Sequence, residues 1–230
     1  MVVDLINQYV TVIVTYWSFF LDVLKLRKQI DCDYFDYQAL SCALAGSGHI
    51  RRDIGRLIKA GHINRVKKGL YIWGDDLRRG PYSKQVLSNL IFGPSYVSLE
   101  SALSFYGLIP ERVEVTTAVT PKRNKFFETP VGTFEYCYLQ AKTYPWGITW
   151  KKAEGAGSFL IASPEKAILD YIAIRVKKWE DELSSENFLY EDLRFDESEF
   201  KKINFSTMKK LSSYYKSKAV GIFVKEVGRG

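Results

Sequence analysis

Apolar residues recur at helical spacing through the first 26 residues of the chain. They lie three or four positions apart, and polar residues fill the opposite stripe, which predicts an amphipathic helix. The 17 residues between Asp4 and Asp22 carry no charge but are fewer than the roughly 20 that span a bilayer, and no basic leader or cleavage site marks a signal peptide. We expect this helix to pack against the rest of the protein or a second copy, with membrane contact as the alternative. Its apolar stripe comprises Leu5, Tyr9, Val12, Tyr16, Phe19, Val23 and Leu26.

Two short helices are predicted next. Asp33 or Asp36 can cap a helix over residues 37–44, and a turn follows. Ser47 is then expected to cap a second helix that ends at Gly61. The apolar face of this second helix is formed by Ile50, Ile54, Leu57 and Ile58.

A basic hairpin follows the second helix. Two short strands are predicted at residues 62–66 and 70–73, joined by residues 67–69 with the sequence Lys-Lys-Gly. Glycine suits the positive φ of such a turn. Helix, helix, turn, helix and basic hairpin is the order of a winged helix-turn-helix.

Residues 74–83 are polar and contain glycine and proline, so we expect a linker there. It separates a domain over residues 1–79, holding the N-terminal helix and the winged helix-turn-helix, from a domain over residues 80–230. A helix is expected over residues 83–92, and Ser98 and Ser163 are expected to cap helices, the latter with proline at the first helical position. Strands are expected at residues 96–98, 114–119, 125–128, 133–139 and 159–162.

The fold class predicted is α+β: a winged helix-turn-helix followed by a mixed α/β domain with a charged helical tail. The tail changes sign along its length. Residues 181–199 hold eight acids against Arg194, and residues 200–225 hold seven lysines and no acid. The two blocks either pair within a helical hairpin or form solvated helix faces.

Charge is concentrated on the predicted winged helix-turn-helix. The net charge of the chain is +7, and residues 47–73 hold seven basic residues against Asp53 alone. A local excess of this kind is expected where a polyanion binds. On the wheel of the second helix, Arg52, Arg56 and Lys59 lie opposite the apolar face. The candidate DNA-binding residues are Ser47, His49, Arg51, Arg52, Arg56, Lys59, Lys67 and Lys68.

The arginines and lysines of this set have expected roles on double-stranded DNA. We assign Arg51 and Arg52 to base edges or the nearest phosphates, because arginine is the commonest reader of guanine. Arg56 and Lys59 are assigned to phosphates, and the hairpin lysines to a phosphate or the minor groove. Gly55 leaves room for close approach to the backbone. The alternative is that the outward face of this helix is polar only for solubility and does not bind DNA.

Three cysteines without metal-ligand spacing and two histidines argue against a zinc site and are typical of a reduced cytoplasm. Ser163 and Lys166 have the Ser-x-x-Lys spacing of penicillin-recognising acylases, but the partner motifs are missing. Gly46-Ser47 matches the start of a nucleotidyltransferase pattern, but the Asp-x-Asp metal pair that should follow it is missing. A metal nuclease would need carboxylates on adjacent strands rather than in a charged tail. We expect no enzyme activity, cofactor or metal.

Four sequence blocks, in this order and spacing, resemble the AbiEi-type antitoxins of type IV toxin–antitoxin systems, an abortive-infection family of phage defence. The Ser-Ala-Leu and Tyr-Gly-Leu-Ile-Pro-Glu block, together with the Ser-Pro-Glu-Lys-Ala block, is the more specific part. The N-terminal helix is not part of the resemblance. The blocks are RVKKGLYI (65–72), YVSLESALSFYGLIPE (96–111), FFETPVGTFEYCYL (126–139) and IASPEKAILDYI (161–172).

The resemblance implies two activities. The winged helix would bind inverted repeats in the promoter of its own operon and repress it. The C-terminal domain would oppose a cognate nucleotidyltransferase toxin, typically without a stable complex. The polar residues in or near these blocks that could form an antitoxin surface are Glu100, Arg123, Glu165 and Lys166, for which a structural salt bridge or cap is an equal alternative. Two other functions remain open: a transcriptional regulator whose C-terminal domain senses a ligand, and a nuclease targeted by the winged helix.

Overall fold

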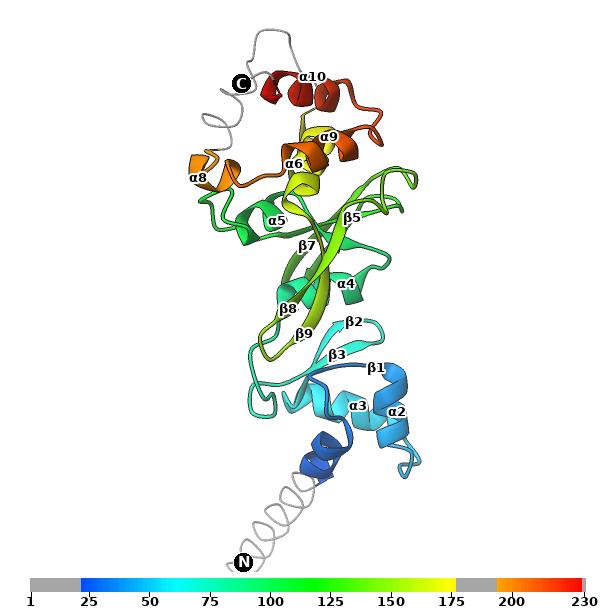
Figure 1. Cartoon of the computed structure of the whole chain (residues 1–230). Coiled ribbons are helices and arrows are strands. Elements are labelled where there is room, and N and C mark those ends of the chain that lie inside the picture. The colour runs from blue at the N-terminus through cyan, green and yellow to red at the C-terminus, as the bar shows by residue number, and fades with distance from the viewer. Residues whose placement is uncertain (1–21, 177–193, 229–230) are drawn as a thin grey trace, which may run out of the picture. The chain divides into compact units, whose positions relative to one another are not determined.

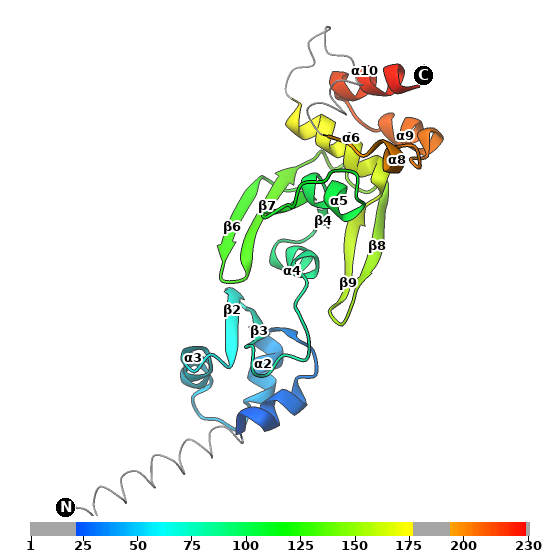
Figure 2. The same ribbon diagram turned by 90° about the vertical axis from the view of Figure 1, so that its left-hand side faces the viewer.

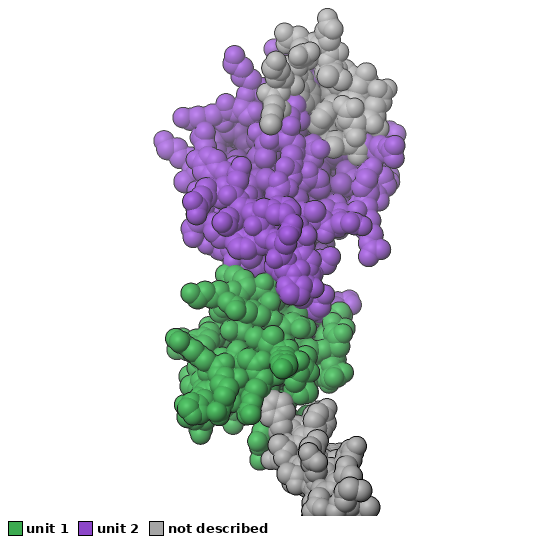
Figure 3. Space-filling view, turned by 180° about the vertical axis from the view of Figure 1, so that it is seen from behind, with its two compact units in different colours: residues 1–81 green, residues 82–230 purple. Residues whose placement is uncertain are grey.

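The computed structural model describes residues 22–176 and 194–228. The fold is mixed α+β with two sheets, and the chain divides into two compact units, residues 1–81 and 82–230 (Figures 1 and 3). The division lies two residues beyond the expected boundary. Most of the expected amphipathic helix, residues 1–21, lies outside the described residues. Its end is helical over residues 22–29, with Val23 and Leu26 buried.

The elements of unit 1 surround a small antiparallel sheet with strand order β1-β3-β2. The predicted short helix is confirmed as α2, and Asp36 caps it by accepting from the amide of Ala39 at 2.8 Å. The basic hairpin is also confirmed, as β2 and β3, with Gly69 at φ +85°. The three-residue strand β1 was not predicted. The elements are β1 (Tyr34–Asp36), α2 (Tyr37–Ala43), α3 (Ile50–Lys59), β2 (Ile63–Lys67) and β3 (Leu70–Trp73).

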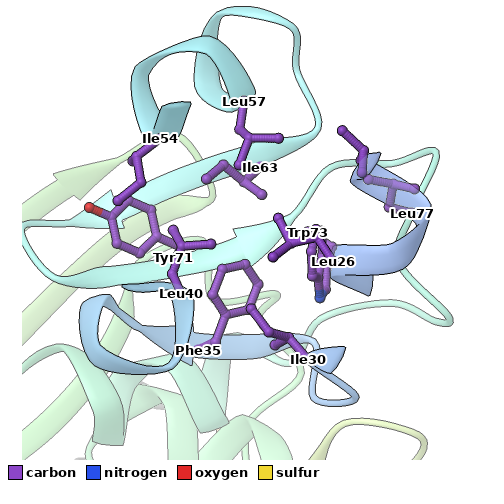
Figure 4. Packing of buried hydrophobic residues seen from close by; sticks show 11 residues of the cluster. Leu26, Ile30, Phe35, Leu40, Ile54, Leu57, Ile63, Tyr71, Trp73 and Leu77 are labelled. Carbon is purple, nitrogen blue, oxygen red and sulfur yellow. The ribbon is translucent and has the colours of Figure 1, made fainter. Parts of the chain in front are cut away.

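The core of unit 1 lies between the helices and this sheet (Figure 4). Ile54 and Leu57 of α3 point toward Ile63 and Tyr71 of the hairpin strands. Helix α3 is therefore held by one face, as its apolar pattern predicts. The cluster contains Val23, Leu26, Ile30, Phe35, Leu40, Ile54, Leu57, Ile63, Tyr71, Trp73 and Leu77.

Unit 2 is built on a six-stranded mixed sheet with the order β6-β7-β5-β4-β9-β8. Strands β4 and β9 are parallel, as are β5 and β7, and the other neighbours are antiparallel. Strand β8 was not predicted. The strands are β4 (Tyr96–Val97), β5 (Thr116–Thr120), β6 (Lys125–Thr129), β7 (Gly132–Tyr138), β8 (Ile148–Ala153) and β9 (Gly157–Ala162).

Helix α4 lies between the β6–β7 and β8–β9 hairpins in Figure 2, and α6, α9 and α10 gather at the other end of the sheet. Ser163 caps α6 as predicted, and Ser83, which begins the helix predicted over residues 83–92, caps α4. The cap predicted at Ser98 is wrong, because α5 begins after Leu99 and no side chain caps it. The helices are α4 (Lys84–Ile91), α5 (Glu100–Phe105), α6 (Pro164–Arg175), α8 (Glu197–Phe200), α9 (Phe205–Ser212) and α10 (Lys218–Val227).

Part of the charged tail, residues 181–193, lies outside the described residues. In the described part, Lys201 and Lys202 each form an ion pair at 2.6 Å, with Glu197 and Glu199 of α8. These are neighbouring pairs on a solvent-exposed helix. Within residues 22–176 and 194–228, none of the helices has the length and apolar character needed to cross a bilayer.

Candidate nucleic-acid interface

Helix α3 places its basic residues in solvent. Arg51 and Lys59 are exposed, and the side chains of Arg52 and Arg56 are 60% and 62% exposed. Because Ile54 and Leu57 hold the opposite face in the core, the helix cannot rotate these cations inward without unburying both. The predicted separation of apolar and basic faces is therefore present in the structure. Ile58 departs from it, since it is 36% exposed rather than buried.

Asp53 neutralises part of this charge. Its carboxylate lies 3.7 Å from Nε of Arg52 and 3.9 Å from Nη1 of Arg56. Pairs at such distances on an exposed surface contribute little to stability. Both guanidinium groups therefore keep free donors that a phosphate or a base edge can accept.

The predicted capping role of Ser47 is wrong. Helix α3 begins at Ile50, its N-cap position is His49, and no side chain caps it. The Ser47 hydroxyl instead accepts from the amide of His49 at 3.1 Å and hydrogen-bonds the Asp53 carboxylate. Ser47 thus orders the turn before α3, and the exposed His49 lies at the N-terminal end of the helix.

The hairpin contributes two different lysines. Lys68 is exposed in the turn beside Gly69, whereas Lys67 belongs to β2 and is partly buried. Burial lowers the pKa of Lys67, because removal from water disfavours the ammonium form. Arg65, also on β2, is exposed and was not among the candidate residues. The available signal was that Arg65 is a basic residue on the strand that leads into the Lys-Lys-Gly turn.

A groove of about 500 Å³ runs between residues 22–29 and α3. Its lining includes the buried apolar residues Val23, Leu26 and Leu57 as well as Arg52, Asp53 and Arg56. The two arginines therefore border both the groove and the exposed face of α3. The groove is lined by Asp22, Val23, Lys25, Leu26, Gln29, Ala43, Leu44, Gly46, Ser47, Arg52, Asp53, Arg56 and Leu57.

In unit 2, two of the residues expected on an antitoxin surface, Glu100 and Glu165, form hydrogen bonds that stabilise the fold. Glu100 forms a bidentate pair with Arg175, at 2.8 and 3.2 Å, and Arg175 also binds Glu135. The Arg175 hydrogen bonds lower the pKa of Glu135. Glu165 accepts from the hydroxyl of Ser163 at 2.9 Å and from the amide of Asn204 at 3.2 Å. Glu100 and Glu165 therefore have structural roles, which were the alternative to a place on an antitoxin surface.

The expectation that Lys166 lies on a surface is wrong. Its side chain is 1% exposed, because α6 turns it toward Asp170, whose side chain is fully buried. The Lys166 ammonium lies 3.4 Å from Asp170 and 3.2 Å from the hydroxyl of Tyr215. Desolvation lowers the pKa of Lys166, although Asp170 opposes this shift. A buried ion pair of this kind is stable only when hydrogen bonds satisfy its remaining groups.

Asp170 receives those hydrogen bonds from three hydroxyls. Tyr96 donates at 2.9 Å, Ser98 at 2.8 Å and Tyr215 at 2.6 Å. Ser98 is therefore committed to Asp170 rather than to a helix cap. The network joins the Tyr-Val-Ser and Ser-Pro-Glu-Lys blocks, and we name Tyr96, Ser98, Lys166, Asp170 and Tyr215 the buried network.

The signal for the buried network was present in the sequence. Lys166 and Asp170 are four residues apart and so share one face of a helix whose neighbouring positions are apolar. By contrast, Arg123 is exposed in the turn before β6, where its side chain can meet a partner. The four candidate residues of the antitoxin surface therefore do not form one exposed site.

No protein-family model and no curated protein matches the sequence. The resemblance to AbiEi-type antitoxins accordingly stays a prediction carried by the four blocks.

Proposed function

We propose that the chain is a cytoplasmic DNA-binding antitoxin of a type IV toxin–antitoxin system, which represses its own operon and opposes a nucleotidyltransferase toxin. In this proposal unit 1 is a winged helix-turn-helix, α3 is its recognition helix and β2–β3 is its wing. The observation that carries the proposal is the exposed row of Arg51, Arg52, Arg56 and Lys59 on a helix whose opposite face is buried.

The geometry of α3 suits a duplex groove. A recognition helix enters the major groove with its N-terminal half foremost, and Arg51 and Arg52 lie in that half. A guanidinium matches O6 and N7 of guanine together. Lys68, exposed in the hairpin turn, is placed to bind a flanking phosphate.

For unit 2 the support is the resemblance. Glu100, Glu165 and Lys166 have structural partners, so Arg123 is the candidate residue that we propose for contact with a partner. The buried network explains why the two most specific blocks occur together, since it joins them in one core. We propose that neutralisation needs this core intact and does not need a stable complex.

Binding to the promoter of its own operon tests the first activity. We expect Arg52→Ala with Arg56→Ala to abolish binding of labelled promoter DNA in fluorescence anisotropy, while circular dichroism stays unchanged. Six neutralised phosphates would give a slope of about −5 for log affinity against log salt. The matched control, Lys28→Ala with Arg112→Ala, removes two exposed charges outside α3 and the hairpin and should bind as the unaltered protein does. Salt-independent binding, or equal loss in both double variants, would contradict the proposal.

Co-expression with an adjacent nucleotidyltransferase gene tests the second activity. The unaltered chain should restore growth, and so should the Arg52→Ala, Arg56→Ala variant, because repression and neutralisation lie in different units. Loss of rescue in that folded variant would overturn this division of labour. Promoter binding without any rescue would favour the regulator with a ligand-sensing C-terminal domain, and Mg²⁺-dependent cleavage of plasmid DNA would favour the targeted nuclease.

A further inference from the structure

Two segments of unit 2 carry lysines and no acids. Residues 140–153 hold Lys142, Lys151 and Lys152, and residues 205–218 hold four more lysines. All seven are exposed. The lysines of the second segment are Lys209, Lys210, Lys216 and Lys218.

Aromatic stacking brings these segments together. The rings of Trp146 and Tyr214 are nearly parallel, 9° apart in orientation, with centroids 4.5 Å apart. The hydroxyl of Thr143 donates to the carbonyl of Tyr214 at 2.7 Å. At Gly147, an added Cβ would lie 3.0 Å from the side chain of Leu211, so this side chain packs directly against the backbone of the first segment. Two lysine-bearing segments about 60 residues apart thus form one surface, which we name the lysine–tryptophan face.

The surface also presents unusually exposed indoles. Trp146 is 46% exposed although one of its faces lies against Tyr214, and Trp150 on β8 is 61% exposed. Trp150 lies opposite Leu160 of β9, which is itself 45% exposed. Lys152 lies two residues beyond Trp150 and so points to the same side of the strand, whereas Lys151 points to the other side, over the ring of Tyr106.

We infer that the lysine–tryptophan face binds single-stranded nucleic acid. Platforms for single strands combine a positively charged track for the phosphates with aromatic rings on which successive bases stack. The two exposed indoles supply the stacking surfaces, and the lysines of the two segments other than Lys151 supply the charge. The face lies wholly within unit 2, whereas the proposed duplex-binding helix belongs to unit 1.

Other partners of a basic surface fit less well. An acidic protein or an anionic membrane would use the lysines, but neither needs an open indole beside them. A second copy of the chain pairing along the edge strand β8 would bring four ammonium groups, Lys151 and Lys152 from each copy, into one junction. Bases are the one group among these partners that matches both the charge and the flat aromatic faces.

The test measures binding of the full chain to labelled oligonucleotides of about 15 nucleotides, a length within the range of known single-strand platforms. Three probes of matched sequence are compared: single-stranded RNA, single-stranded DNA and duplex DNA. The Arg52→Ala, Arg56→Ala background removes the contribution proposed for α3. In that background we expect single strands to bind and to quench tryptophan fluorescence, and the RNA and DNA arms to show which sugar is preferred.

Trp150→Ala should weaken single-strand binding about tenfold, since one stacked base is worth roughly that factor. Trp150→Phe should retain most of the affinity, because it keeps a ring to stack on. Phe126→Ala is the matched control, as Phe126 is 53% exposed on β6 at the opposite edge of the same sheet. It should leave binding unchanged.

Trp150→Ala alters an exposed side chain, so loss of binding in a folded variant cannot be assigned to unfolding. The inference is overturned if Trp150→Ala and Phe126→Ala bind single strands equally, or if anionic vesicles bind as tightly and ignore Trp150. It is also overturned if the Arg52→Ala, Arg56→Ala background alone abolishes single-strand binding. Failure of duplex binding with intact single-strand binding would contradict the proposed repressor and leave this inference standing.

Discussion

The guanidinium of Arg27 lies over the indole of Trp73, 5.2 Å from the ring centroid. Arg27 is 6% exposed, and its Nε donates to the carbonyl of Leu77 at 2.8 Å. Its Nη2 binds the carboxylate of Asp33 at 2.5 Å. One buried side chain from residues 22–29 thus contacts Asp33, Trp73 and Leu77 of unit 1.

We expect Arg27→Ala to lower the free energy of unfolding by about 3–5 kcal/mol, because it leaves a partly buried carboxylate and a backbone carbonyl without their donor. Urea unfolding followed by circular dichroism measures the effect. Lys28→Ala, at the exposed neighbouring position, should change stability by no more than about 0.5 kcal/mol. If both variants unfold at the same urea concentration, Arg27 does not hold the unit together.

Unit 1 is the part of the fold that the sequence predicts best. Helices α2 and α3 and the β2–β3 hairpin are local, so their periodicity, caps and turn glycine are visible within short windows. Strand β1 is three residues long, and it forms because β3, more than 30 residues away, offers an unpaired edge. A pairing at that distance leaves no local pattern.

Unit 2 shows a different limit to what can be predicted from the sequence. Lysine and aspartate are normally expected in solvent. Lys166 and Asp170 can be buried because Tyr96, Ser98 and Tyr215 donate hydrogen bonds to Asp170. These three residues come from segments that are distant in the sequence. Strand β8 was missed because none of its positions is buried and its three exposed positions are consecutive, so it lacks the alternation of buried and exposed positions that marks a half-buried strand. Candidate chemistry read from residue types alone therefore assigned Lys166 to a surface.

The buried network predicts unequal effects at its two charged ends. We expect Asp170→Ala to destabilise unit 2 by about 3–5 kcal/mol, because it leaves three buried hydroxyls and an ammonium group without their acceptor. Lys166→Met should cost less, since Asp170 keeps its three hydroxyl donors and the new side chain fills the apolar space. Chemical denaturation of the two variants side by side measures the order. The reverse order would show that the lysine, not the carboxylate, organises the network.

The tyrosines of unit 2 predict loss of stability at alkaline pH. Burial raises the pKa of Tyr106 and of Tyr144 to about 12, and burial together with the charge of Asp170 raises the pKa of Tyr96 and Tyr215 well above the ordinary value. Between about pH 10 and pH 12 the unfolded chain loses protons that the folded chain keeps, so the free energy of unfolding falls as pH rises. The lowered pKa of Lys166 acts in the opposite direction, but its effect ends near the ordinary lysine value.

The ionisation of the tyrosines can be followed directly by the absorbance of tyrosinate as the pH is raised. The buried tyrosines Tyr96 and Tyr215 should ionise together with the loss of near-ultraviolet circular dichroism. A single smooth titration of every tyrosine near pH 10 in the folded protein would contradict the prediction.

Gly55→Ala separates the stability of α3 from its use in binding. Gly55 lies in the middle of α3, and an added Cβ would meet no atom within 4 Å. Alanine in a helix interior is favoured over glycine, so the free energy of unfolding should rise by about 0.5–1 kcal/mol. Gly55 is also exposed, and on the helical wheel it lies next to Lys59 and Arg52. If the backbone approaches DNA there, the same methyl group that stabilises the fold should weaken promoter binding. A variant that is more stable and binds promoter DNA at least as tightly would show that α3 does not approach the duplex at Gly55.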